Sequence, residues 1–254
     1  MKEKTDRNRD RRIKKIEFGK LDKLSYRSNE SFKTLRTNIQ FSGEDIHTIA
    51  FTSCTPNEGK SNVTFNLCRS FAENEKSALL VDADLRKSVL AGRYKIGAVS
   101  AGLTNYLAGQ AELEDVLCET DIPNMHIIVS GPYAPNPAEL LGTQKFAAMV
   151  AGFRKKYDYV LIDCPPLGSV IDAAIVARES DGVVLIIEDN AISYHFAQEV
   201  KQQLEKSGAR ILGAVLNKVP MEKKGYYGKY YGKYYGKYYG KYYGKYYGTY
   251  GSEE

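Results

Sequence analysis

The sequence lacks any apolar run long enough to cross a membrane. A transmembrane helix needs about 20 consecutive apolar residues, and no stretch of the 254 residues approaches that length. The first residues are charged rather than apolar, which does not fit a secretory signal peptide. From the sequence we therefore expect a soluble, cytoplasmic protein.

Cysteine and histidine are scarce, and neither is spaced for metal binding. The four cysteines form no C-x-x-C pair, and the three histidines are scattered along the chain. We therefore expect reduced thiols, not disulfides or a zinc site. The net charge of +5 is modest, so charge matters mainly where it is concentrated.

Composition divides the chain into three parts. Residues 1–27 are rich in Arg and Lys; we expect a flexible basic arm, either simply solvated or in contact with an acidic partner or an anionic membrane face. Residues 28–220 suit one α/β domain with a substantial core. In residues 221–254 the unit Tyr-Tyr-Gly-Lys recurs with period four. Such a repeat favours neither an amphipathic helix nor an alternating strand, so a disordered low-complexity tail is expected.

The nine residues from Ser53 to Ser61, Ser-Cys-Thr-Pro-Asn-Glu-Gly-Lys-Ser, are typical of a phosphate-binding loop. They follow the apolar run 49–51 and precede a predicted helix over 62–73. In such loops backbone N–H groups point at an anion, the lysine reaches the phosphates and the serine hydroxyl binds Mg²⁺. Cys54 replaces the first glycine of the motif, so a chance Gly-Lys-Ser is the alternative. The predicted nucleotide-binding residues are Pro56, Asn57, Glu58, Gly59, Lys60, Ser61 and Asn62.

Two further apolar runs, which indicate buried parallel strands, end in aspartates. Asp82 and Asp84 follow the run 78–81, and side chains two apart on a strand point the same way. Asp163 ends the run 159–162 and is followed by two prolines within three residues. Ligands of open parallel sheets bind at the carboxyl ends of the strands. We therefore expect the three aspartates and the Gly-Lys-Ser loop at one edge of a sheet.

The remaining elements alternate along the chain. The patterns predict helices over 28–41, 137–153, 170–178 and 195–207, short helical pieces within 87–120, and strands over 125–129, 182–187 and 211–217. Strands interleaved with helices predict an α/β fold with a doubly wound, mostly parallel sheet of the P-loop NTPase type.

Taken together, these motifs resemble the bacterial tyrosine kinases of capsular and exopolysaccharide synthesis (BY-kinases). The Walker A loop of that family ends in G-K-S, as residues 59–61 do. Its second motif, three apolar residues followed by D-x-D-x-R, is matched by residues 79–86, and its Walker B motif, an apolar triplet followed by D-x-P-P, by residues 160–166. A C-terminal tyrosine cluster completes the resemblance, which runs from about Ser28 to the end.

The resemblance implies a protein-tyrosine kinase that uses ATP and Mg²⁺. Lys60 would bind the phosphates and Ser61 would bind Mg²⁺, whereas Asp84 and Asp163 would hold the metal directly or through water. Asp82 would be the candidate base for the tyrosine hydroxyl, so that the catalytic residues are Lys60, Asp82, Asp84 and Asp163. The phosphate acceptors would be thirteen tyrosines of the tail, Tyr226, Tyr227, Tyr230, Tyr231, Tyr234, Tyr235, Tyr238, Tyr239, Tyr242, Tyr243, Tyr246, Tyr247 and Tyr250.

The resemblance also implies partners. The family's oligomerisation motif E-x-x-R-x-x-R appears as Glu30, Lys33 and Arg36, where Lys33 keeps the charge of the first Arg but loses its bidentate fork. A homo-oligomeric ring, an octamer, is implied. The short form is activated by the cytoplasmic tail of a separate transmembrane adaptor, which recruits it to the inner face of the cell membrane. A cognate tyrosine phosphatase and other protein substrates are also expected, and no nucleic acid.

Two other classes fit parts of the sequence. A partitioning ATPase of the deviant Walker A class, without kinase activity, carries a signature lysine where this chain has Thr55, and it gives the tail no role. A nucleic-acid-binding module could use the aromatic, basic tail for stacking, but it leaves the three aspartates unexplained. The three classes can be separated by experiment. A kinase transfers phosphate to tyrosine, a partitioning ATPase only hydrolyses ATP, and a nucleic-acid-binding module only binds RNA.

Overall fold

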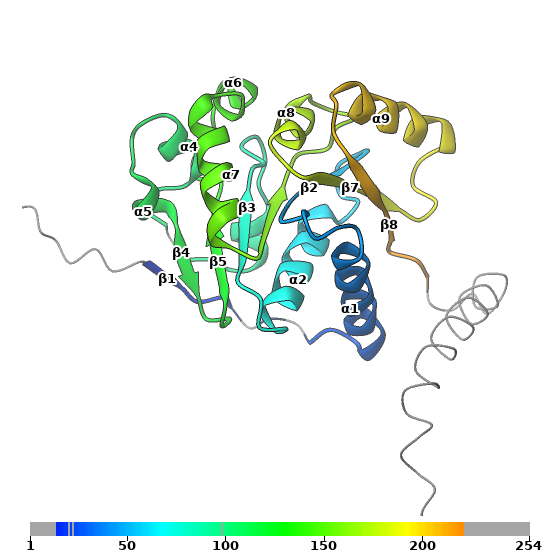
Figure 1. Cartoon of the computed structure of the whole chain (residues 1–254), viewed down its shortest axis with the longest axis horizontal. Helices are drawn as coiled ribbons and strands as arrows, with labels where there is room; N and C mark the ends of the chain where they lie inside the picture. Colours follow the sequence, from blue (N-terminus) through cyan, green and yellow to red (C-terminus); the bar gives the residue numbers. More distant parts are fainter. Residues whose placement is uncertain (1–13, 20, 22, 98, 221–254) are drawn as a thin grey trace, which may run out of the picture. The chain divides into compact units, whose positions relative to one another are not determined.

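The computed structural model describes residues 14–19, 21, 23–97 and 99–220 (Figure 1). Contacts within the chain divide it into two units, 1–217 and 218–254. Residues 1–13 of the predicted basic arm, and the predicted tail with its thirteen tyrosines, lie outside the described residues. The helices and strands of the described residues all belong to the first unit.

A mixed sheet forms the centre of this unit. Its eight strands lie in the order β1-β4-β5-β3-β6-β2-β7-β8, and β4–β5 is antiparallel whereas the other neighbouring pairs are parallel. The predicted α/β fold with a mostly parallel sheet is confirmed. The strands are β1 Lys14–Ile16, β2 Thr48–Ser53, β3 Ala78–Asp82, β4 Cys118–Thr120, β5 Met125–Ile128, β6 Tyr159–Asp163, β7 Gly182–Glu188 and β8 Ile211–Asn217.

Helices cover both faces of the sheet, as the doubly wound architecture requires (Figure 1). On one face lie α1 Tyr26–Gln40, α2 Lys60–Ala72 and α3 Leu90–Arg93. The other face carries α4 Leu103–Leu107, α5 Leu113–Val116, α6 Pro137–Leu141, α7 Gln144–Lys156, α8 Asp172–Arg178 and α9 Tyr194–Lys206. None of the helices in the described part of the chain is long and apolar enough to cross a bilayer.

The central strands read as unbroken apolar runs because they are buried on both faces. In β3, Leu79 and Val81 belong to the core under α4–α9, whereas Leu80 belongs to the core under α1 and α2. Burying each such side chain contributes roughly 1.5–3 kcal/mol. This core on both faces fixes the positions of β3 and its neighbour β6, so that Asp82 at the end of β3 lies opposite Asp163 at the end of β6.

The N-terminal segment corrects the predicted boundary of the basic arm. The sequence predicted a flexible arm over residues 1–27. In the structure, strand β1 within that range pairs with β4, and the side chains of Ile16 and Phe18 are buried. The ring of Phe18 meets that of Phe65 edge to face at 5.0 Å. Short polar–apolar alternation ending at Phe18 was the signal for this strand, but basic residues surround it.

Two helical predictions are also corrected. The region 87–120, predicted to hold only helical pieces, ends in strand β4. The single helix predicted over 137–153 is two helices, α6 and α7, because Gly142 caps the first and Thr143 starts the second. The Thr143 hydroxyl accepts a hydrogen bond from the Phe146 N–H, as an N-cap residue does.

Candidate active site

The Gly-Lys-Ser loop joins the end of β2 to the start of α2. Gly59 has φ of 93°, a left-handed conformation that favours glycine, and immediately precedes the helix. No side chain caps the N-terminus of α2. The first N–H groups of a helix lack partners within the helix, so this end is suited to bind an anion.

Glu58 supports the loop from inside. Its side chain is buried, and its carboxylate accepts hydrogen bonds from the Cys54 N–H at 3.0 Å and from the Thr55 hydroxyl at 2.9 Å. Burial raises the pKa of Glu58. Of the predicted nucleotide-binding residues, Glu58 therefore has its side chain committed to the loop itself, whereas Pro56 and Asn57 are exposed.

Lys60 lies between two of the predicted aspartates. Its Nζ is 3.1 Å from Asp84 Oδ2 and 3.6 Å from Asp163 Oδ1, and all three side chains are almost fully buried. Burial disfavours the charged ammonium, but the carboxylates of Asp163 and then Asp84 outweigh it and raise the pKa of Lys60. The ammonium therefore stays charged in the interior.

Asp82 completes the acidic cluster. Its side chain is fully buried; the Ser88 hydroxyl donates to Oδ2, and the Asp84 N–H donates to Oδ1 at 3.3 Å. Burial and then the charge of Asp163 raise the pKa of Asp82 to about 7. A carboxyl group with such a pKa can take up and release a proton near neutral pH.

Asp163 carries a buried oxygen that suits a metal ion. Its Oδ1 has no hydrogen-bond partner among the described residues, although Lys60 lies 3.6 Å away. The same residues contain no group of three His, Cys, Asp or Glu that could hold a metal by itself. Mg²⁺ is usually bound by one or two carboxylates together with substrate phosphates. Ser61, Asp84 and Asp163 therefore fit Mg²⁺ that arrives with a nucleotide.

Some polar contacts of the site had no signal in the motifs. The Asn217 amide, at the end of β8, donates to the Glu58 carbonyl at 2.8 Å and so ties the loop to the edge strand. Asn62, next to Ser61, accepts a hydrogen bond from the Tyr94 hydroxyl at 3.2 Å. A polar residue at a strand's carboxyl end could have indicated Asn217, but nothing in the sequence singles out Tyr94.

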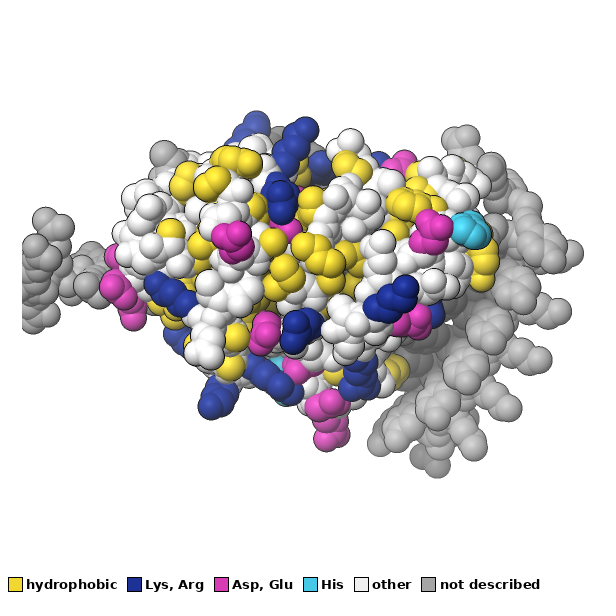
Figure 2. Space-filling model, turned by 90° about the horizontal axis from the view of Figure 1, so that it is seen from above, with side chains coloured by type: hydrophobic (Ala, Val, Ile, Leu, Met, Phe, Trp, Pro, Cys, Tyr) yellow, Lys and Arg dark blue, Asp and Glu magenta, His cyan; other side chains and the backbone are white. Residues whose placement is uncertain are grey.

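The loops at this edge of the sheet also expose hydrophobic side chains. Tyr133, after β5, is 70% exposed and Ile171, after β6, is 57% exposed. The face seen from above carries hydrophobic side chains interspersed with charged ones of both signs (Figure 2). Such a mixed surface suits contact with a polypeptide.

The predicted oligomerisation residues divide into two sets. Lys33 and Glu30 form an exposed ion pair of 2.8 Å within α1. Arg36 instead donates from Nη1 to the Ser70 carbonyl at 2.6 Å and to its hydroxyl at 3.2 Å, which fastens α1 to α2.

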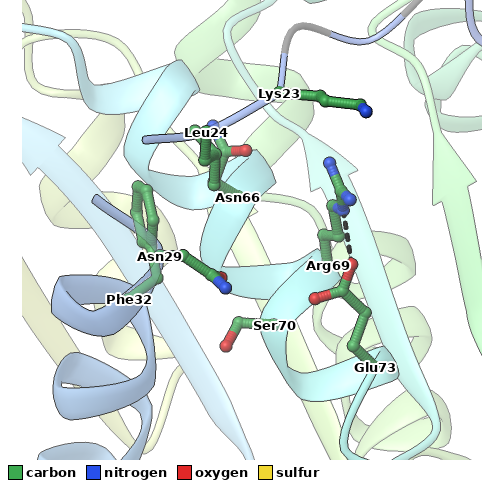
Figure 3. A pocket seen from close by; sticks show the side chains of 8 residues that line it. All are labelled: Lys23, Leu24, Asn29, Phe32, Asn66, Arg69, Ser70 and Glu73. Carbon is green, nitrogen blue, oxygen red and sulfur yellow. Dashed lines mark hydrogen bonds and ion pairs between the residues drawn. The ribbon is translucent and has the colours of Figure 1, made fainter. Parts of the chain in front are cut away.

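A pocket of about 230 Å³ lies beside this junction (Figure 3). Its lining contains neither residues of the phosphate-binding loop nor any of the three aspartates, so it is separate from the candidate active site. It is lined by Lys23, Leu24, Asn29, Phe32, Asn66, Arg69, Ser70 and Glu73.

A glycine-containing loop at a helix N-terminus, with a buried lysine and aspartates at the carboxyl edge of a parallel sheet, defines a P-loop nucleotide-binding protein. Comparison with known proteins agrees: a family model described as an AAA domain matches residues 46–212. Tyrosine-protein kinase CpsD of Streptococcus agalactiae is 42% identical over 202 residues, which are 80% of this chain and 87% of that protein.

Solved structures lead to the same family. The kinase domain of the Escherichia coli tyrosine kinase ETK is similar with a TM-score of 0.74 and 30% identity, over 78% of each chain. The septum site-determining protein MinD of Pyrococcus horikoshii, complexed with Mg-ADP, gives 0.61 and 28% identity, over 70% of this chain and 72% of that one. The chain belongs to the AAA domain family and, within it, to the bacterial tyrosine kinases. The predicted enzyme class, a protein-tyrosine kinase, is confirmed.

Replacing Asp82 by Asn is expected to stabilise the protein at pH 8 in the absence of nucleotide and divalent cations. Because the pKa is raised from 3.8 to about 7 on folding, the stability that Asp82 contributes is present below about pH 4 and lost as the pH rises through 7. An uncharged amide avoids that loss. Urea unfolding should give Asp82→Asn an advantage on the order of 2–4 kcal/mol at pH 8 and clearly less at pH 5. An advantage that does not grow with pH would contradict this electrostatic description.

Proposed function

We propose that this chain is an ATP- and Mg²⁺-dependent tyrosine kinase that phosphorylates its own C-terminal tyrosine cluster in trans. The proposal further assigns it the regulation of capsular or exopolysaccharide synthesis or export. The observation that carries it is the position of Lys60 between Asp84 and Asp163 beside the phosphate-binding loop. The acceptor is suggested by the thirteen tyrosines of residues 226–250.

In this proposal the loop and the aspartates divide the work of phosphoryl transfer. The N–H groups at the start of α2 and the Lys60 ammonium bind the phosphates of ATP. Ser61, Asp84 and Asp163 would hold Mg²⁺, which when bound would neutralise charge on the phosphates.

Asp82 takes the proton of the acceptor. As the tyrosine oxygen bonds to the γ-phosphorus, the phenolic proton passes to the Asp82 carboxylate, and the bond from the γ-phosphorus to the β–γ bridging oxygen breaks to leave ADP. A pKa near 7 suits that exchange because the base is then partly ionised at neutral pH yet basic enough to accept the proton.

Lys60 has a second task in this proposal. Its ammonium lies where it neutralises Asp84 and Asp163, so it competes with a divalent cation for both carboxylates. When phosphates arrive, Lys60 exchanges its carboxylate partners for phosphate oxygens, and Asp84 and Asp163 would then be free to hold Mg²⁺. Metal binding and nucleotide binding are thereby coupled through one side chain.

The tail suits this site by length and charge. Residues 225–254 carry five lysines and two glutamates, and 30 extended residues reach on the order of 100 Å. A basic, tyrosine-rich segment of one copy can therefore reach the acidic site of another. Each phosphotyrosine adds about −1.5 to −2 charges. About two modifications thus cancel the charge of the tail and weaken its attraction to the site.

The partners are inferred from family membership and are part of the proposal. They are a ring of copies, a transmembrane adaptor that activates the kinase at the inner face of the cell membrane, a cognate tyrosine phosphatase and further protein substrates. In such a ring Glu30 and Lys33 are exposed at the surface of α1, whereas Arg36 would have to leave Ser70 to contact a neighbour.

Asp163 and Asp82 should fail in different ways when each is replaced by Asn. Losing the Asp163 carboxylate should weaken the binding of Mg-ADP, because the metal loses a ligand. Losing the Asp82 carboxylate should slow the single-turnover rate about 10²- to 10⁴-fold, the usual contribution of a general base, with little effect on Mg-ADP affinity. Calorimetric affinities and quenched-flow rates separate the two, and equal losses of both quantities in both variants would refute the division of roles.

Transfer in trans can be tested by mixing two full-length variants, neither of which can phosphorylate its own tail. Lys60→Met keeps the tail but should lose at least about 100-fold in activity, since its phosphate-binding charge is gone. A second chain keeps Lys60 but has the thirteen tail tyrosines replaced by Phe. Mass spectrometry of the mixture with Mg-ATP should find phosphotyrosine on the Lys60→Met tail.

Lys76→Met, which removes an exposed ion-pair partner of Asp158, is the matched control and should phosphorylate its own tail like the wild type. Phosphate on wild-type tails but not on the Lys60→Met tails would show transfer in cis and contradict the proposal.

A further inference from the structure

Arg86, the last residue of the D-x-D-x-R motif, has no role in the phosphoryl transfer proposed for Lys60 and the three aspartates. Its guanidinium forms two parallel hydrogen bonds with Asp172, from Nε to Oδ2 at 2.8 Å and from Nη2 to Oδ1 at 2.9 Å. The Asp172 side chain is fully buried and that of Arg86 is 36% exposed. Such a bidentate fork fixes both the distance and the relative orientation of the two groups.

The pair links the two loops that come after the catalytic strands. Arg86 stands two residues after Asp84, in the loop after β3, and Asp172 is the first residue of α8, which comes after β6. β3 and β6 are neighbours, and the bond from the Ala83 N–H to the Asp163 carbonyl, 2.8 Å, joins the loop after β3 to the end of β6. The Arg86–Asp172 pair connects the two loops again beyond that point.

The acidic cluster makes such a connection necessary. Asp82, Asp84 and Asp163 are buried together, and Asp82 lies opposite Asp163 in the ladder between β3 and β6. Like charges held this close in the interior of a protein repel one another. Repulsion of this kind pushes the loop after β3 away from the end of β6. Asp84 is held within its own loop by the Lys87 N–H at 3.0 Å, so any displacement of the loop carries Asp84 with it.

We propose that Arg86 and Asp172 are a positioning pair for phosphoryl transfer, which sets Asp82 and Asp84 at the correct distance from Asp163. This inference rests on the proposed roles of those three aspartates. Both Asp172 oxygens are engaged by the Arg86 guanidinium, so the pair acts through the two loops that it joins. Misplacing reacting groups by about 1 Å can cost about 100-fold in rate.

The test compares Arg86→Lys, which keeps the charge but not the fork, with the isosteric Asp172→Asn. For each we expect kcat for tyrosine phosphorylation to fall about 10- to 100-fold, and the Mg²⁺ concentration for half-maximal rate to rise severalfold. Binding of ADP without metal should stay near wild type, because the phosphate-binding loop is untouched. The double variant should be no slower than the slower single variant, because both remove the same interaction.

Arg154→Lys is the matched control. Arg154 forms an ion pair of 2.9 Å with the nearly buried Asp181 side chain. Asp181 also accepts hydrogen bonds from the N–H groups of His47 and Thr48 at the start of β2, at the end of the strand away from the candidate active site. Its replacement should lower the unfolding temperature without changing kcat per folded molecule or the Mg²⁺ dependence.

Three results would contradict the proposal that Arg86 and Asp172 are a positioning pair. One is wild-type kcat and Mg²⁺ dependence in both Arg86→Lys and Asp172→Asn. Another is loss in Arg86→Lys alone, which would mean that Arg86 contacts phosphate directly. The third is an equal loss in Arg154→Lys, which would mean a general effect of stability. A wild-type chain that hydrolyses ATP without phosphorylating tyrosine would contradict the proposed function instead. In that case the ATP hydrolysis rates of the same three variants, compared with the wild type, test the positioning role of Arg86 and Asp172.

Discussion

The contact of the Lys60 ammonium with Asp84 and Asp163 is the interaction on which the rest of the site depends. Three carboxylates are buried there beside one ammonium, and burying charge is expensive unless it is paired and hydrogen-bonded. With neither Lys60 nor a divalent cation beside them, mutual repulsion would push the aspartates apart or protonate them. With Lys60, the cluster keeps an excess of acidic oxygens, one of which has no hydrogen-bond partner in the described part of the chain.

The three buried aspartates are held in place by the strands, cores and loop contacts that surround them. The ladder between β3 and β6 sets Asp82 opposite Asp163, and both strands are anchored in cores on two faces. The phosphate-binding loop is held from inside by the Glu58 carboxylate and from β8 by the Asn217 amide. A site that concentrates charge for phosphoryl transfer is thus stabilised by contacts that lie around it, at the cost of local stability.

The sequence predicted the location of the site because strand geometry is local. Alternation along β3 and the carboxyl-edge rule were enough to bring Asp84 and Asp163 to the Gly-Lys-Ser loop, and the structure places them there. Strands β1 and β4 were missed because three residues are too few to show a period. The inward turn of Glu58 and the bond from Arg36 to Ser70 depend on partners that local patterns do not specify.

The central claim is that Lys60 competes with a divalent cation for Asp84 and Asp163, and metal binding without nucleotide tests it most directly. Mn²⁺ binding can be followed by electron paramagnetic resonance for the wild type and for Lys60→Met. Removing the ammonium should free both carboxylates, so the variant should bind Mn²⁺ at least about tenfold more tightly, as expected for relief of a like charge at close range. Equal or weaker binding by Lys60→Met would contradict the account.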